Sequence, residues 1–114
     1  LGWKKDNGAL QRGVAIFDKK GPSNNMYYNY YATQIMRHYG GDEWEKWNEV
    51  MRDKMVNSQA KEGADKGSWY IGGDQGARAG GRLYCTSMAT MILEVYYRHM
   101  PLFKQEAAED DFPL

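Results

Sequence analysis

The sequence predicts an all-α protein built from antiparallel α/α hairpins. Three observations lead to this fold class. Apolar residues recur at helical spacing, capping residues and Gly or Pro separate these runs, and one helical segment recurs further along the chain. With 114 residues, the chain is long enough for one core and too short for a second domain of ordinary size.

Two helices are expected in the first forty residues. The first follows a capping Asp6 or Asn7 and ends at the Gly-Pro pair 21–22. Its apolar face is formed by Leu10, Val14 and Phe17. The second follows Asn24 or Asn25 and ends at the glycine pair 40–41. Its helically spaced apolar residues are Tyr28, Ala32, Ile35, Met36 and Tyr39.

A third, amphipathic helix is expected to begin at residue 42. Asp42 and Glu45 have the spacing of a capping box, in which the side chain of each residue accepts a hydrogen bond from the backbone amide of the other. The expected apolar stripe consists of Trp44, Trp47, Met51, Met55 and Ser58. Residues 63–81 then contain seven glycines, which predicts a long loop.

A fourth helix is expected over residues 88–99, capped by Thr86 or Ser87 and stopped by Pro101. It is apolar on nearly every side, which is typical of a helix that is covered on both faces. Its apolar residues include Ala89, Met91, Ile92, Leu93, Val95 and Tyr96. Residues 1–103 are therefore predicted to form two helix pairs, followed by an acidic, flexible tail over residues 104–114.

The charge balance and the cysteine content exclude several classes of function. Fifteen basic residues balance fifteen acidic ones, so no net field favours nucleic acid. Polar residues or glycines interrupt every apolar run before it reaches the length of a membrane span. The single cysteine, Cys85, cannot form an internal disulfide. The cellular compartment is left open.

An internal repeat links the second and fourth helices. Residues 32–36 read Ala-Thr-Gln-Ile-Met and residues 89–93 read Ala-Thr-Met-Ile-Leu, and each segment is followed at the same distance by a tyrosine, Tyr39 or Tyr96. A recurring helix pair is typical of stacked helical repeats, in which each repeat buries its apolar face against its neighbour. The alternative is chance similarity between two buried helices.

A second motif lies at the end of the third helix, where Gln59 is followed by Gly67-Ser68-Trp69. With a longer spacer, it resembles the QW motif of squalene and oxidosqualene cyclases. In that motif a Gln amide bonds backbone groups at helix ends and a tryptophan covers it. Residues 8–100 are accordingly similar to the repeats of the terpenoid-cyclase and protein-prenyltransferase superfamily. The resemblance implies part of a larger (α/α) toroid, whose first element here continues before Leu1.

The chemistry of the superfamily is expected to be incomplete in this segment. The cyclase acid cluster, Asp-x-Asp-Asp, has only Glu109-Asp110-Asp111 as a counterpart, and the complement-type thioester run is excluded by Cys85-Thr86-Ser87-Met88. The prenyltransferase zinc site needs an aspartate two residues before the cysteine, where this chain has Leu83. We therefore predict no catalytic, cofactor-binding or metal-binding residues in the chain.

Three tyrosines are candidates for the lining of a ligand cavity. Tyr28, Tyr31 and Tyr96 could line a cavity for an isoprenoid, although core packing explains the same residues. Arg78 and Arg82 in the glycine-rich loop could bind an anion, without a known phosphate-binding spacing to support this role.

Two hypotheses follow. The chain is a non-catalytic scaffold or binding segment of a toroid, or it is part of an isoprenoid cyclase or prenyltransferase whose catalytic residues lie elsewhere. The expected partners are the remainder of the toroid or a second copy of the chain. A second copy would bury Met88, Ile92 and Val95 of the fourth helix, or the aromatic residues of the second.

Overall fold

Helices are the only regular secondary structure in the described part of the chain. The computed structural model describes the backbone of residues 4–110 and the side chains of residues 4–95. This part contains four helices and no strand: α1 (Gly8–Lys20), α2 (Met26–Tyr39), α3 (Gly41–Ser58) and α4 (Gln75–Asp110). The expected all-α class is confirmed.

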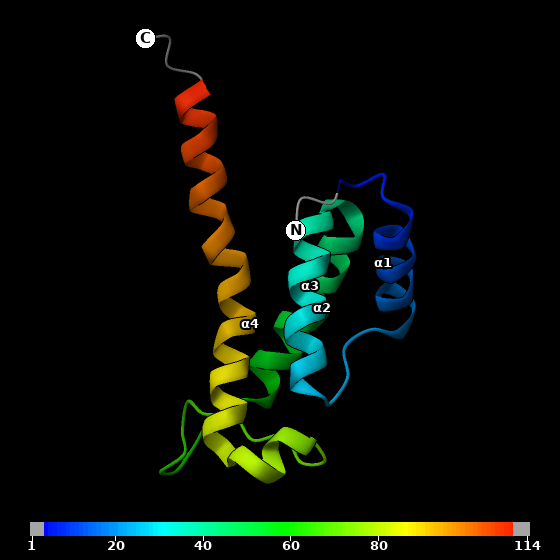
Figure 1. The fold of residues 1–114 in the computed structure, drawn as a ribbon. Helices are drawn as coiled ribbons and strands as arrows, with labels where there is room; N and C mark the ends of the chain where they lie inside the picture. Colours follow the sequence, from blue (N-terminus) through cyan, green and yellow to red (C-terminus); the bar gives the residue numbers. More distant parts are fainter. Residues whose placement is uncertain (1–3, 111–114) are drawn as a thin grey trace.

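The helices α2 and α4 lie side by side (Figure 1). The helices α1 and α3 run downward in this view, whereas α2 and the long part of α4 run upward. Thus α2 is antiparallel to both α1 and α3 and nearly parallel to α4. The most extensive helix contact is the one between α2 and α4. This contact brings the N-terminal ends of these two helices together.

The caps of the first two helices agree with the sequence prediction. The side chain of Asn7 accepts hydrogen bonds from the backbone amides of Ala9 and Leu10, and the side chain of Asn25 accepts one from Tyr28. Each residue satisfies donors that have no partner within the helix. Helix α1 ends at Gly21 and α2 ends at Gly40.

The predicted capping box of the third helix is wrong. Gly40, with a φ of 74°, is both the C-terminal cap of α2 and the N-terminal cap of α3, and no side chain caps α3. The chain reverses direction over so few residues that Asp42 already lies in the first turn of α3. There its carboxylate interacts favourably with the helix dipole without forming a box with Glu45.

The predicted start of the fourth helix is also wrong. Helix α4 begins at Gln75, eleven residues before the expected cap at Thr86, and bends at Gly81, which has a φ of 60° and a ψ of −149°. Residues 75–80 form a short segment that lies across the lower end of the molecule in Figure 1. The glycine-rich sequence therefore contains a helical segment, and only residues before it form the loop.

Tyr84 explains why two glycines are needed in this short segment. A Cβ atom added at Gly76 would lie 2.2 Å from Cζ of Tyr84, and one added at Gly80 would lie 2.6 Å from Cβ of Tyr84. The Tyr84 ring is thus packed directly on the backbone of the preceding segment. Close approach of this kind is a general reason for glycine within helices.

We expect Gly80→Ala to destabilise the protein by about 1–3 kcal/mol, because two backbone-attached Cβ atoms would overlap and cannot rotate apart. The matched control is Gly13→Ala in α1, where the added Cβ meets no atom within 4 Å. This control should stabilise the protein by about 0.5–1 kcal/mol. Urea unfolding measures both. Equal stabilisation by the two changes would contradict the packing of Tyr84 on Gly80.

Pro101 does not end the fourth helix. The backbone of α4 continues to Asp110, so the helix includes residues 104–110 of the expected tail. Pro101 removes one N–H donor from the helix but leaves the backbone helical on both sides. Residues 111–114 lie outside the described part of the chain.

One face of α4 is buried by the chain itself. Met88, Ile92 and Val95 are all buried within the core, whereas Leu83 and Thr90 are exposed. Within the chain, α4 is therefore covered on one side and not on both. The three buried residues also do not form the surface for a second copy that the sequence suggested, because α4 already packs on α2 through this side.

Candidate functional site

Trp69 joins the end of α3 to the start of the long part of α4. Its indole is 6% exposed, and its Nε1 donates a hydrogen bond of 2.8 Å to the carbonyl of Met55 in the last turns of α3. The backbone amide of Trp69 donates to Oγ1 of Thr86 at 3.0 Å, and the Thr86 hydroxyl lies 3.3 Å from the Trp69 carbonyl. A residue in the loop therefore bonds two helices.

Gln59 and Gly67 lie together beside this tryptophan. Gln59 is the C-terminal cap residue of α3, and its Nε2 donates to the Gly67 carbonyl at 2.9 Å. Two backbone hydrogen bonds, Ala60 to Ser68 and Gly67 to Ala60, close the same loop. The Gln59 amide thus bonds the loop, and the Trp69 indole N–H, not the glutamine, satisfies the helix-end carbonyl. This division of roles differs from that expected of a QW motif.

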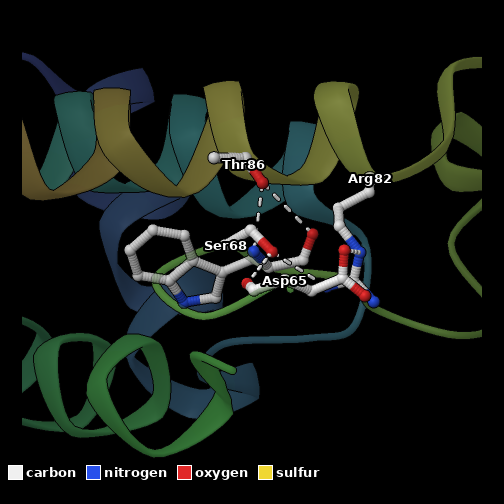
Figure 2. A network of polar contacts seen from close by, with 5 residues as sticks. Asp65, Ser68, Arg82 and Thr86 are labelled. Atoms are coloured by element: carbon white, nitrogen blue, oxygen red, sulfur yellow. Dashed lines mark hydrogen bonds and ion pairs between the residues drawn. The ribbon is translucent and has the colours of Figure 1, made fainter. Parts of the chain in front are cut away.

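Arg82 adds a polar network that sequence reasoning missed (Figure 2). Its Nη1 donates to Oγ of Ser68 at 3.1 Å, and its Nε lies 3.6 Å from Oδ1 of Asp65. The guanidinium also lies over the Tyr70 ring, 5.6 Å from the ring centre. Ser68, Asp65 and Tyr70 therefore already contact the guanidinium of Arg82. These contacts attach the loop to α4, and they do not favour the hypothesis that Arg82 binds an anion.

Asp74 is a buried carboxylate at the meeting point of two helix N-termini. It is 3% exposed. Its Oδ2 accepts a hydrogen bond of 3.1 Å from the backbone amide of Met26, and its Oδ1 accepts one of 2.9 Å from Gly76. The side chain therefore caps α4 and also bonds the first residue of α2. Negative charge is favourable at both helix ends.

The candidate cavity tyrosines have different surroundings. The Tyr28 ring packs edge-on against Phe17 and Trp47, and its hydroxyl donates to the Gly21 carbonyl at 3.1 Å. Burial raises the pKa of this phenol. Tyr31 is exposed and contacts other tyrosines. Tyr28 therefore belongs to the packing between α1, α2 and α3, and the side chain of Tyr96 lies outside the described residues.

A cluster of tyrosines lies near the N-terminus of α2. The rings of Tyr27 and Tyr31 are 4.6 Å apart, and those of Tyr30 and Tyr31 are 5.3 Å apart. A hydrogen bond with Tyr31 raises the pKa of Tyr27. Burial, followed by the charge of Asp74, raises the pKa of Tyr84 on the neighbouring helix. The raised pKa values keep the phenols of Tyr27 and Tyr84 neutral at physiological pH.

Cys85 is fully buried, and its sulfur accepts a hydrogen bond of 3.5 Å from the amide of Ile71. Among the described side chains, no three His, Cys, Asp or Glu residues are placed to hold a metal ion. Leu83, two residues before Cys85, is exposed to solvent, and its side chain has no atom that can bind a metal. This environment is that of a structural thiol.

The comparisons with known proteins leave the family open. No protein-family model, no curated protein and no solved structure matches this chain. In the part of the chain that the structure describes, every helix is too short or too polar to cross a lipid bilayer.

Proposed function

We propose that the chain is a segment of a helical-repeat domain of the prenyltransferase and squalene-cyclase kind, and that it acts as a non-catalytic scaffold or binding segment. The parallel packing of α2 on α4, with antiparallel partners on the other side of α2, is the observation that carries the proposal. In such repeats an inner helix recurs in the same direction, and each inner helix packs on the next.

The repeated sequence supports the same proposal. Ala32 and Ala89 occupy matching positions of the two segments, and both are fully buried. A small residue at a helix contact allows close approach of the two backbones. Trp69 and Ser68 of the loop after α3 form hydrogen bonds with Met55 of α3 and with Thr86 and Arg82 of α4, so the loop links the two helices. These features suit a structural repeat, and none of them creates a reactive group.

The test is to assay the purified protein for the chemistry of the superfamily. We expect no product from squalene or oxidosqualene, none from farnesyl diphosphate with a cysteine peptide, and no zinc in metal analysis. Product formation would favour the alternative of an isoprenoid enzyme. One zinc ion per chain that is lost in Cys85→Ser would contradict the proposal, because Cys85 is then a ligand.

A further inference from the structure

The tyrosines at the start of α2 fall into a packed group and an exposed pair. Tyr28 packs in the core against Phe17 and Trp47. Tyr27 and Tyr31, in contrast, are 58% and 45% exposed. Residues four apart in a helix lie one above the other, and the ring centres of this pair are accordingly 4.6 Å apart. The start of α2 therefore presents two adjacent phenols to solvent.

The hydroxyl groups of this exposed pair also lie together. A hydrogen bond with Tyr31 favours the neutral phenol of Tyr27 and raises its pKa. In a phenoxyl radical, the ring carbons next to the C–O group are the ones that couple to a second ring. Two hydroxyl groups that share a hydrogen bond bring such a carbon of one ring near its counterpart in the other. Because both side chains are exposed, they can rotate to close the remaining distance without moving the core.

The neighbouring tyrosines are held by other contacts. Nε2 of Gln34 donates a hydrogen bond of 2.7 Å to the hydroxyl of Tyr30, and consecutive residues of a helix point in different directions. Tyr84 of α4 lies beside Tyr27, but its ring is packed on the backbone of residues 76–80. These contacts leave the exposed pair as the favoured partners for a covalent link.

We propose that Tyr27 and Tyr31 form an oxidative modification site, at which a haem peroxidase with hydrogen peroxide joins their rings into an intramolecular dityrosine. Each phenol gives up one electron and one proton to the oxidant, and the two radicals form one carbon–carbon bond between the rings. The hydrogens on the joined carbons then move as protons to the phenol oxygens. Hydrogen peroxide takes up the two electrons and two protons and is reduced to two water molecules. The link ties successive turns of α2 together at the end that Asp74 joins to α4.

The experiment is oxidation of the full chain, at low concentration, by a haem peroxidase and hydrogen peroxide. Dityrosine fluorescence is measured in the monomer after separation from larger species. Trypsin releases residues 21–37 as one peptide. In the oxidised monomer, this peptide should be lighter by two hydrogen atoms. It should also give no fragment ions from cleavage between residues 27 and 31, because the link holds both pieces together.

Single substitutions identify the two rings. Tyr31→Phe and Tyr27→Phe each keep an exposed ring and lose the phenol, so both variants are expected to fold and to lose the fluorescence and the mass change in the monomer. Tyr70→Phe is the matched control, since it removes a different tyrosine that is 51% exposed, and it should leave both signals unchanged. A synthetic peptide of residues 21–37 tests the role of the fold. Tyr28 is not packed in a core there, so links to it should also form.

Several results would overturn the proposal: no dityrosine in the monomer, a link confined to residues 30 and 31, or a link that survives Tyr31→Phe. The same distribution of links in the peptide and in the protein would also overturn it, because the fold would then not select the pair. The proposed function does not depend on this site. Its failure would instead appear as enzymatic product or bound zinc in protein that has not been oxidised.

Discussion

Replacing Trp69 by alanine should destabilise the protein by about 3–5 kcal/mol, because a buried indole is removed from the core and leaves a cavity. The change also removes the hydrogen bond to the Met55 carbonyl, which is a buried acceptor in the last turns of α3. We expect faster amide hydrogen exchange in that part of α3 in addition to the lower free energy of unfolding of the whole protein. Urea unfolding followed by far-UV circular dichroism measures the first effect, and hydrogen exchange measures the second.

Two further variants separate the contributions to this contact. Trp69→Phe keeps most of the apolar area and loses the indole N–H, so it should cost less than the alanine change. Gln59→Ala removes only an exposed hydrogen bond to Gly67 and should cost about 0.5–1 kcal/mol. If Gln59→Ala were as damaging as Trp69→Ala, the glutamine would have the central role that the QW resemblance implies, and our assignment of that role to the indole would be wrong.

The helix boundaries that depend on local residues were predictable. Asn7 and Asn25 cap the helices that follow them, and a glycine ends each of these helices, as the sequence indicated. The start of α4 was not predictable from local signals. A glycine-rich segment has low helix propensity. It is helical here because Asp74 caps it and because the Tyr84 ring packs on its glycines. Both causes depend on tertiary structure.

The candidate site was predicted in part for the same reason. The motif at Gln59 and Trp69 identified residues that lie together, because its spacing is short. Helical spacing placed Tyr28 on the apolar face of α2, where it packs against Phe17 and Trp47. Tyr31 is not on that face and is exposed. Asp74 was missed as a contact of α2 because its partner, Met26, is 48 residues away. An aspartate directly before Gln75-Gly76 is nevertheless a capping signal that the sequence contains.

Replacing Asp74 by alanine is expected to destabilise the protein by about 2–4 kcal/mol. The backbone amides of Met26 and Gly76 both donate to this carboxylate, and its removal leaves a buried donor at the N-terminus of α2 and a partly buried one at that of α4. Asp74→Asn keeps the size of the side chain but replaces one acceptor oxygen with a donor, so it should cost an intermediate amount. Thermal and urea unfolding of the two variants test this order.

The control for Asp74 is Asp65→Asn, which removes the charge from an exposed ion pair with Arg82. Exposed pairs contribute about 0–1 kcal/mol, so this variant should be close to the unchanged protein in stability. Hydrogen exchange gives a more specific result. Asp74→Ala should speed exchange at Met26 on α2 as well as at Gly76 on α4, because one side chain protects both amides. Faster exchange at Gly76 alone would show that Asp74 is only a local cap and that the parallel ends of α2 and α4 are held together by apolar packing.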